Sequence, residues 1–571
     1  MIFKKDQKNK SSDKTDRQVV ELQVSGMTCD SCATHVVKAL QQLDGIIEAR
    51  VPNWQENKAL VTVEGEVQDK VLAKTVKRAG YGAKVLGRSD LSRVVAKGSD
   101  RDLDYDLVVI GTGGGGVAAS IRAAENGHKV AIVEAGTIGG TCVNIGCVPS
   151  KTLIRAADVF HKAGRHSFAG IHTRAESVDW PVLIAQKDEL VAELRQQKYV
   201  DVLNSYEGIT LIKDRAKLAE NGDVVVAGKT LKAGRVVVAT GAKPKNLPLD
   251  GIEKVEVLDS TSAMALKGQP KSMIVIGGRA IALELGQAFA RLGTKVTILQ
   301  RSERLVPEHD PEIGDALAHC FREEGIEVET GATPQAIREE NQEKIVTATV
   351  RGEQREFRAE QVLMAVGRTP NTKEMGLQEA GVELNEGGFI VVDEHLQSSN
   401  PKIYAVGDVT TLPNFVYVAA AAGGMAAENA LNGNAKKFDL SILPDVIFSD
   451  PQIATVGLTE TQAKAEGYDV KTSTLPLEYV PRALAARDTR GFIKLVADRK
   501  SDRLLGAHVL AAEAGELIQT AALAVKMGKE YGFTIQGLRD MLFPYLVQVE
   551  GLKLAAQTFE KDVAQLSCCA G

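Results

Sequence analysis

The stretch YDLVVIGTGGGG, residues 105–116, decides the fold of the largest part of this chain. Its apolar first half predicts a buried parallel strand, and Gly111, Gly113 and Gly116 then match the pattern G-x-G-x-x-G. These glycines permit a tight turn and let a pyrophosphate approach the N-terminus of the next helix. The following strand-like run ends at Glu134, where a carboxylate can accept hydrogen bonds from a ribose. The stretch therefore predicts a Rossmann-like dinucleotide-binding unit.

A second unit of the same kind begins at Gly277, although Arg279 replaces its middle glycine. At the end of its second strand stands the neutral Gln300 instead of a carboxylate, and Arg301 and Arg304 follow. A carboxylate there would repel a 2′-phosphate, whereas guanidinium groups can bind one in bidentate fashion. The second unit is therefore expected to take NADPH in preference to NADH. The alternative is that both arginines are solvated surface charges.

Two cysteines, Cys142 and Cys147, lie shortly after the first glycine-rich loop. If residues 148–150 lead into a helix, Cys147 lies close to its N-terminal turn. The positive end of the helix dipole lowers the pKa of a thiol there and favours the thiolate. The pattern predicts a redox-active pair beside a bound nucleotide, and two ordinary buried cysteines are the alternative.

The segment GGTCVNIGCVPSK, residues 139–151, resembles the redox-active segment of the flavin disulfide oxidoreductases. The resemblance implies FAD and NADPH as cofactors, with electrons passing from NADPH through the flavin to Cys142 and Cys147. It also implies that Glu284 lies near the nicotinamide and pairs with Lys151. The cofactor contacts implied on the flavin side are Gly136, Thr141, Lys151, Ala216, Thr240, Gly241, Asp408 and Val416.

Residues 19–86 alternate strand-like and helix-like segments in the order βαββαβ, which is the ferredoxin-like plan. Within them Cys29 and Cys32 form a C-x-x-C pair just before a helix. Two thiolates suit a low-coordinate soft ion such as Hg(II) or Cu(I), and no second Cys/His pair follows to complete a zinc site. The loop GMTCDSC, residues 26–32, resembles that of heavy-metal-associated domains; a thioredoxin-like redox pair is the rival. We expect His35 to lie on the helix surface rather than to bind metal.

Two adjacent cysteines, Cys568 and Cys569, lie close to the end of the chain. Adjacent Cα atoms lie ~3.8 Å apart, whereas disulfides usually begin near about 4.4 Å, so a bridge between them would be strained. The pair is better suited to act as free thiolates that pass a soft metal onward from a mobile tail. An incidental terminal pair is the alternative. The remaining cysteine, Cys320, falls in an amphipathic helical stretch and is expected to be a small buried apolar residue.

One substitution separates this chain from the disulfide reductases that it resembles. In those enzymes a His-Pro motif is followed by Glu five residues after the His, and the His exchanges protons with the thiol substrate. Here Tyr545 stands in place of the His, while Glu550 is kept. A phenol with a pKa near about 10 is a poor base at neutral pH. The resemblance implies that Tyr545 lies close to bound metal, and a packing role is the alternative.

The predicted fold class is α/β, with two Rossmann-like nucleotide-binding domains and an α+β dimerisation domain after a ferredoxin-like metal-binding domain. A chain of 571 residues is too long for a single core. The predicted parts are a disordered leader (1–18), a heavy-metal-associated domain (19–86), a linker (87–103), an FAD-binding domain (104–265 and 386–440), an NADPH-binding domain (266–385) and a dimerisation domain with the Cys-Cys tail (441–571).

The composition is ordinary for a soluble protein, with 44% hydrophobic and 25% charged residues. A net charge of −5 argues against nucleic acid or a membrane surface as the main partner. No apolar run reaches the roughly 18 residues of a membrane span. The start, MIFKKDQKNKSSDKTDR, lacks the apolar core of a signal peptide, which favours the cytoplasm.

Together these resemblances imply reduction of Hg(II), supplied as a thiol complex, to volatile Hg(0), and hence mercury detoxification. The predicted metal ligands are the three cysteine pairs, and the resemblance implies a homodimer. Hand-over of the metal from a membrane mercury transporter is a further expectation. Two other classes remain open, a dithiol/disulfide oxidoreductase and a non-catalytic metal carrier or sensor.

Overall fold

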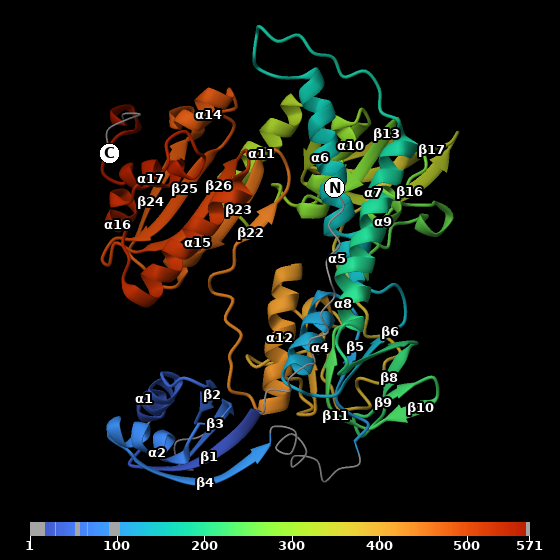
Figure 1. Cartoon of the computed structure of the whole chain (residues 1–571). Coiled ribbons are helices and arrows are strands. Elements are labelled where there is room, and N and C mark those ends of the chain that lie inside the picture. The colour runs from blue at the N-terminus through green and yellow to red at the C-terminus, as the bar shows by residue number, and fades with distance from the viewer. Residues whose placement is uncertain (1–16, 29, 52–56, 66, 91–102, 567–571) are drawn as a thin grey trace, which may run out of the picture. The chain divides into compact units, whose positions relative to one another are not determined.

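The computed structural model describes residues 17–28, 30–51, 57–65, 67–90 and 103–566 (Figure 1). The chain divides into two compact units, and the boundary between them lies between Asp104 and Tyr105. No helix in the described part of the chain combines the length and the apolar character that a bilayer crossing requires.

The first unit is a four-stranded antiparallel sheet in the order β2-β3-β1-β4, with two helices in the βαββαβ succession. Strand β3 alternates buried and partly exposed residues, so one of its faces supplies the core. Val20 and Leu22 from β1 and Val61 from β3 are fully buried in this core. The elements are β1 (Arg17–Ser25), α1 (Asp30–Gln41), β2 (Ile46–Arg50), β3 (Lys58–Glu64), α2 (Asp69–Arg78) and β4 (Gly82–Asp90).

Strand β4 is longer than the sequence suggested. It runs to Asp90 and pairs with β1 as far as Gln18, so residues 87–90 are strand and not part of a linker. The polar side chains are accommodated because Arg88 donates hydrogen bonds to Asp69 and Gln18. The predicted leader (1–18) overlaps β1, whose first two residues are Arg17 and Gln18. The rest of that leader and most of the predicted linker lie outside the described residues.

In the second unit, residues 105–110 form β5, the central strand of a five-stranded parallel sheet in the order β21-β11-β5-β6-β7. The last four residues of β5 are all buried, as a central parallel strand requires. The strands are β5 (Tyr105–Ile110), β6 (Val130–Glu134), β7 (Ile209–Lys213), β11 (Ala233–Val238) and β21 (Ile403–Ala405). The helices are α4 (Gly114–Glu125), α5 (Gly140–Ile145), α6 (Cys147–Gly164), α7 (Trp180–Arg195), η2 (Gln196–Val200), α8 (Asp201–Asn204) and α12 (Val416–Asn432).

Helix α4 packs along α12 at unusually close range. A Cβ atom on Gly423 would lie 2.0 Å from the carbonyl oxygen of Gly115, so only glycine fits at that position. This contact joins the first glycine-rich loop to a helix that begins some three hundred residues later in the chain.

The second Rossmann-like sheet is also parallel, in the order β15-β14-β13-β19, and an antiparallel three-stranded sheet accompanies it. Its elements are β13 (Ser272–Ile276), α10 (Ala280–Arg291), β14 (Lys295–Gln300), α11 (Pro311–Glu323), β15 (Glu327–Thr330), β16 (Ala332–Glu340), β17 (Glu343–Val350), β18 (Glu353–Ala359) and β19 (Gln361–Met364). Smaller elements beside the two sheets are β8 (Ala216–Leu218), β9 (Val224–Val226), β10 (Lys229–Leu231), β12 (Ala242–Pro244), α9 (Ser260–Met264) and β20 (Arg368–Pro370).

The last part of the chain is an antiparallel sheet in the order β22-β23-β26-β25-β24. All eight residues of β26 are buried, because α15 and α11 both pack against this strand. The elements are β22 (Asp445–Ile447), β23 (Gln452–Gly457), α13 (Glu460–Ala465), β24 (Val470–Pro476), α14 (Pro481–Ala486), β25 (Phe492–Asp498), β26 (Leu504–Ala511), α15 (Ala514–Tyr531), α16 (Ile535–Asp540) and α17 (Glu550–Gln557). The predicted fold class is confirmed.

Candidate active site

The first glycine-rich loop and the segment with the two thiols touch backbone to backbone. Gly140 has φ +64°, and a Cβ atom on it would lie 2.5 Å from the Cα of Gly113. Gly111 has φ +107°, and its Cβ would lie 2.4 Å from the carbonyl oxygen of Ala239. Glycine is needed at both positions because a side chain would strain the backbone and push away the segment that each one faces. Cys142 follows Gly140 by two residues, so the contact between Gly140 and Gly113 brings the first thiol close to the nucleotide loop.

The two thiols are brought together by a break between two helices. Cys142 lies in α5 and Cys147 is the first residue of α6, with Gly146 between the helices. A Cβ on Gly146 would lie 2.9 Å from the carbonyl oxygen of Thr141, so the tight junction also requires glycine. The two sulfurs share a hydrogen bond, and both side chains are partly buried.

That hydrogen bond divides the pair into a thiol and a thiolate. Donation from Cys142, helped by Lys151 and opposed by burial, lowers the pKa of Cys147 to about 7. The same hydrogen bond, followed by burial, raises the pKa of Cys142 far above its usual value. Cys147 also lies at the N-terminus of α6, as the sequence predicted, where the helix dipole favours an anion. Above about pH 7 the pair therefore carries one negative charge and one proton.

Lys151, one turn along α6 from Cys147, makes the ion pair that the sequence resemblance implied. Its Nζ lies 2.7 Å from Glu284 Oε2, and the Glu284 side chain is only 7% exposed. The backbone N–H of Phe448 donates to the other oxygen of Glu284, and the ammonium lies 4.6 Å from the centre of the Phe448 ring. The cation is held between an anion and an aromatic face, so its position beside the thiols is well defined.

Tyr199, in η2, is a neighbour of the thiols that the sequence gave no reason to select. Burial, and then electrostatic interaction with Cys142 and Cys147, raises the pKa of its phenol. A protonated phenol beside two sulfurs can donate a hydrogen bond or offer a weak oxygen ligand. No local motif marks this tyrosine, because it approaches the pair from a helix more than fifty residues away.

The residues expected to hold a flavin surround the same loop. Glu134 accepts from the backbone N–H and the hydroxyl of Thr112, and from the N–H of Gly136. Asp408 stands 3.3 Å from the guanidinium of Arg368, and burial raises the pKa of its carboxyl. The buried Nε of Arg368 is the atom that faces Asp408, in an ion pair that lacks the geometry of a hydrogen bond. A glycine cradle beside this buried ion pair fits a large polar cofactor.

The remaining predicted flavin contacts lie at strand ends and helix starts of the same domain. Ala216 begins β8 and is buried. The hydroxyl of Thr240 donates to the carbonyl of Asn371, and Gly241 has φ +66°. Val416 begins α12, and its side chain limits the space beside Gly114. Arg368 also contacts the hydroxyl of Thr141, at 3.4 Å.

The second nucleotide loop is built like the first. Gly277 has φ +130°, and a Cβ on it would lie 2.3 Å from the carbonyl oxygen of Ala365. Arg279 precedes α10 and pairs with Glu308 at 3.3 Å. The buried Gln300 packs against Gly278, where a Cβ would lie 2.7 Å from its amide carbon. The site therefore lacks the carboxylate that would repel a 2′-phosphate.

The structure distinguishes the two arginines that the sequence treated alike. Arg304 is held by Asp315, with its Nε 3.1 Å from one carboxylate oxygen. Arg301 is exposed and, among the described residues, has no carboxylate within ion-pair distance. Arg301 is therefore the more available of the two for an anionic ligand.

The other predicted metal ligands fall partly outside the described residues, which do not include Cys29, Cys568 or Cys569. Cys32 lies in the first turn of α1, half-buried, with the hydroxyl of Thr28 3.6 Å from its sulfur. Tyr545 is 52% exposed just before α17. Cys320 is buried in α11, as expected.

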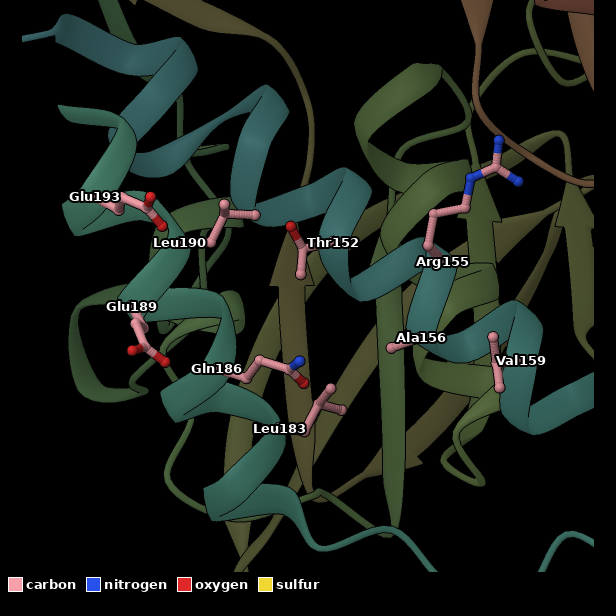
Figure 2. A pocket seen from close by; sticks show the side chains of 9 residues that line it. All are labelled: Thr152, Arg155, Ala156, Val159, Leu183, Gln186, Glu189, Leu190 and Glu193. Carbon is pink, nitrogen blue, oxygen red and sulfur yellow. The ribbon is translucent and has the colours of Figure 1, made fainter. Parts of the chain in front are cut away.

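A separate hollow of about 470 Å³ lies between α6 and α7 (Figure 2). Its lining contains no thiol and no predicted site residue, so it does not include the chemistry described above. The lining residues are Thr152, Arg155, Ala156, Val159, Leu183, Gln186, Glu189, Leu190 and Glu193.

Three family models match the chain. They describe a pyridine nucleotide-disulphide oxidoreductase (residues 105–423), the dimerisation domain of such enzymes (443–556) and a heavy-metal-associated domain (21–82). Among solved structures, the HOCl-induced flavoprotein disulfide reductase RclA of Escherichia coli matches with TM-score 0.71 and 30% identity, over 79% of this chain and 99% of that one.

Curated relatives are similar over nearly their whole length. The mercuric reductase of Lysinibacillus sphaericus is 45% identical over 96% of this chain and 99% of its own. That of Acidithiobacillus ferrooxidans is 46% identical over 98% of this chain and 100% of its own. The chain is a pyridine nucleotide-disulphide oxidoreductase, and within that class it belongs to the mercuric reductase family.

The position of Lys151 beside the thiolate gives a first prediction. Replacing Lys151 by Met removes a cation that favours the Cys147 thiolate, so the pKa of Cys147 should rise above about 7, by up to ~1 unit. The pH dependence of iodoacetamide alkylation at Cys147, followed by mass spectrometry of that peptide, measures the change. Lys162→Met, the same substitution near the other end of α6, is the matched control and should leave the profile in place. An unchanged profile in Lys151→Met would contradict the prediction.

Proposed function

We propose that this protein reduces Hg(II) to Hg(0) with NADPH as electron donor, and that Cys142 and Cys147 hold the metal during reduction. The observation that carries the proposal is the thiol–thiolate pair, packed against a dinucleotide loop by a backbone contact that only glycine permits. Two soft sulfur donors without a third ligand suit a two-coordinate ion such as Hg(II). The relatives named mercuric reductase support this choice of metal.

The ionisation of the pair suits exchange of the metal from a thiol complex. The Cys147 thiolate bonds to the mercury of an external dithiolate complex and displaces one external sulfur, which leaves as a thiol with the proton from Cys142. Cys142, now a thiolate, displaces the second external thiolate. Two metal–sulfur bonds are broken and two are formed, so the exchange leaves the metal as Hg(II). Only the later two-electron reduction changes its oxidation state. The product, Hg(0), has little affinity for thiolate and leaves.

The residues around the thiols fit FAD, which when bound supplies a two-electron relay from NADPH. The turn at Gly111, Gly113 and Gly116 offers N–H groups at the start of α4 to a pyrophosphate. Glu134 would accept from the ribose in place of its present partners, and Asp408 with Arg368 would hold the polar chain of the cofactor. Further contacts are proposed for Gly136, Thr141, Lys151, Ala216, Thr240, Gly241 and Val416.

Glu284 and Lys151 are proposed to orient the nicotinamide side of the same site. Gly277 would bring a pyrophosphate to the start of α10, and Arg301 would bind the 2′-phosphate, with Arg304 in a weaker role because Asp315 holds it.

The half-exposed Tyr545 and the Cys568/Cys569 pair are proposed to act on the active site of a second subunit. The match to a dimerisation domain supports a homodimer. Cys29 and Cys32 are proposed to carry Hg(II) to the core after hand-over from a membrane transporter, in the cytoplasm. The domain boundaries drawn from the sequence are kept as proposals, except that the first domain begins with β1 at Arg17 and extends through β4 to Asp90.

A dithiol/disulfide oxidoreductase is the second candidate, because the solved neighbour in Escherichia coli is named a disulfide reductase. Turnover with lipoamide or oxidised glutathione would support it. Tyr545 favours the metal, since a neutral phenol does not provide the base that thiol–disulfide exchange uses.

The central test removes one metal ligand. Cys142→Ser deletes one of the two sulfurs, so Hg(II)-dependent NADPH oxidation and the release of volatile mercury should both fall to background. Cys320→Ala is the matched control, because it removes a buried thiol of α11 outside the site and should keep both activities. Mercury release at an undiminished rate by Cys142→Ser would refute the proposal.

The cofactor assignment has its own test. Arg301→Ala should raise the KM for NADPH about tenfold, the loss expected for one charge-assisted contact of roughly 1.4 kcal/mol, and leave the KM for NADH nearly unchanged. Arg304→Ala should have a smaller effect, because Asp315 already engages that guanidinium. Equal increases for NADH and NADPH would show that Arg301 does not read the 2′-phosphate.

A further inference from the structure

Helices α6 and α10 are joined by two ion pairs at matching intervals. Lys151 Nζ lies 2.7 Å from Glu284 Oε2, and Arg291 Nη1 lies 2.6 Å from Asp158 Oδ1. On each helix the two partners are seven residues apart, which puts them on one face and about 10.5 Å apart along the axis. The two helices therefore run in the same direction here and meet at two levels, which we call the charge ladder (Lys151–Glu284 and Asp158–Arg291).

The order of charge along the ladder permits only one register. Helix α6 presents a cation and then an anion, whereas α10 presents an anion and then a cation. A two-turn slip would bring Lys151 opposite Arg291, and a one-turn slip would leave buried charges without partners. Removing one member of a buried pair typically costs about 3–5 kcal/mol, so either slip is strongly disfavoured.

A third segment fastens both levels of the ladder. Residues 448–450 run beside α10: the N–H of Phe448 donates to Glu284, and the N–H of Asp450 donates to Gln287 Oε1 at 2.8 Å. Gln287 returns a hydrogen bond from Nε2 to the carbonyl of Asp450 at 2.7 Å, and Asp450 Oδ2 lies 2.9 Å from Arg291. The C-terminal part of the chain is thus attached to α10 turn by turn.

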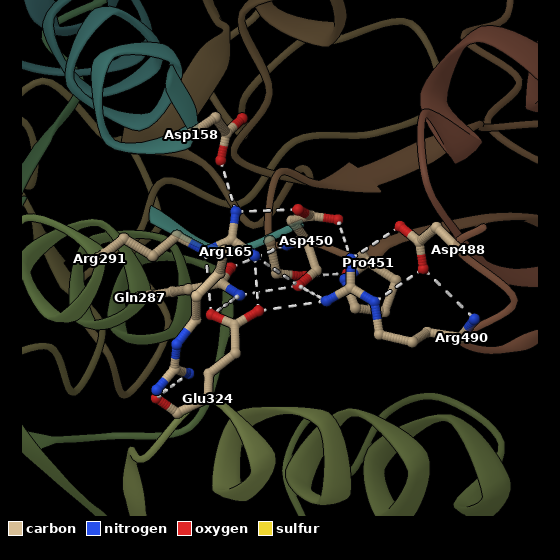
Figure 3. Close-up of polar contacts among 10 residues, drawn as sticks. Asp158, Arg165, Gln287, Arg291, Glu324, Asp450, Pro451, Asp488 and Arg490 are labelled. Carbon is tan, nitrogen blue, oxygen red and sulfur yellow. Dashed lines mark hydrogen bonds and ion pairs between the residues drawn. The ribbon is translucent and has the colours of Figure 1, made fainter. Parts of the chain in front are cut away.

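Arg291 is the centre of the second level of the charge ladder, where it pairs with Asp158 (Figure 3). Its side chain is 3% exposed, and its guanidinium contacts carboxylates of Asp158, Glu324 and Asp450. Arg490 adds a second cation to the cluster and pairs with Glu324, Asp450 and Asp488. Burial raises the pKa of Asp158, and Arg291 and, less strongly, Lys162 oppose that rise. Arg155 of α6 also lies 3.7 Å from Asp158, but its side chain is 63% exposed. Among the ion pairs described for this cluster, only Asp158–Arg291 joins α6 to α10.

We propose that Arg291, through Asp158 and Asp450, is a positioning residue that sets the register of α6 against α10 and so holds the Lys151 ammonium beside Cys147. Arg291 itself lies two helical turns from the Lys151–Glu284 pair and acts only through the ladder. The inference rests on the proposed function solely in taking Cys147 as the reactive thiolate. It concerns how that thiolate is maintained and not which metal it receives.

Positioning and direct electrostatics predict opposite effects for one substitution. Asp158→Asn removes a negative charge, and by Coulomb's law alone this would stabilise the Cys147 thiolate and lower its pKa. If Asp158 acts by holding α6 in register, its loss lets Lys151 move away from Cys147, and the pKa rises. The sign of the change therefore separates the two mechanisms.

The experiment measures alkylation of Cys147 by iodoacetamide against pH in the full-length, reduced, metal-free protein with its cofactor bound. Asp158→Asn and Arg291→Met should both move the profile to higher pH, in the direction of Lys151→Met, and Arg291→Lys should recover part of the change. Arg490→Met is the matched control, because it removes a cation from the same cluster that touches neither α6 nor α10. It should lower the melting temperature without moving the profile.

Three results would overturn the inference. These are a shift to lower pH in Asp158→Asn, no shift in either ladder variant, or an equal shift in Arg490→Met. Asp158→Asn keeps the volume of the side chain, so it remains informative if Arg291→Met does not fold. Because the readout uses no mercury, failure of the ladder would leave the proposed reduction standing, and loss of mercury reduction in Cys142→Ser is tested separately.

Discussion

Two backbones approach each other where Gly113 meets Gly140, and the position of the thiols follows from this contact. A single added carbon at Gly140 would lie 2.5 Å from the facing Cα atom. The contact brings the start of α5, and with it Cys142, to the nucleotide loop, while Gly146 lets α6 begin at Cys147. Helix α12 packs closely on α4 at Gly115, and this packing also stabilises the position of the nucleotide loop that precedes α4.

The charged groups around the two thiols favour the ionisation of Cys147. The proton held by Cys142 and the ammonium of Lys151 lower the pKa of Cys147 to about 7, despite partial burial that opposes ionisation. Lys151 is in turn held by Glu284 and the Phe448 ring. Segments from three parts of the chain therefore cooperate to maintain one negative charge, which we propose as the nucleophile in the exchange of Hg(II) from one thiol to another.

The sequence predicted what short motifs encode and missed what distant segments assemble. Gly111, Cys142 and Cys147 lie in local patterns whose spacing has a direct physical meaning, and the fold class followed from them. Tyr199 and Arg368 could not be selected, because each reaches the site from a segment without a motif of its own. The stronger hold on Arg304 depends on Asp315 in the next helix, and the extension of β4 depends on side-chain partners of Arg88.

The central claim is that Cys142 and Cys147 together bind Hg(II) beside the nucleotide loop. X-ray absorption at the mercury edge tests it directly, using the full chain with Cys29, Cys32, Cys568 and Cys569 replaced by Ser and one equivalent of Hg(II) bound. We predict two sulfur neighbours, falling to one when Cys142 is also replaced by Ser. A spectrum without sulfur neighbours, or one that does not change on the loss of Cys142, would contradict the account.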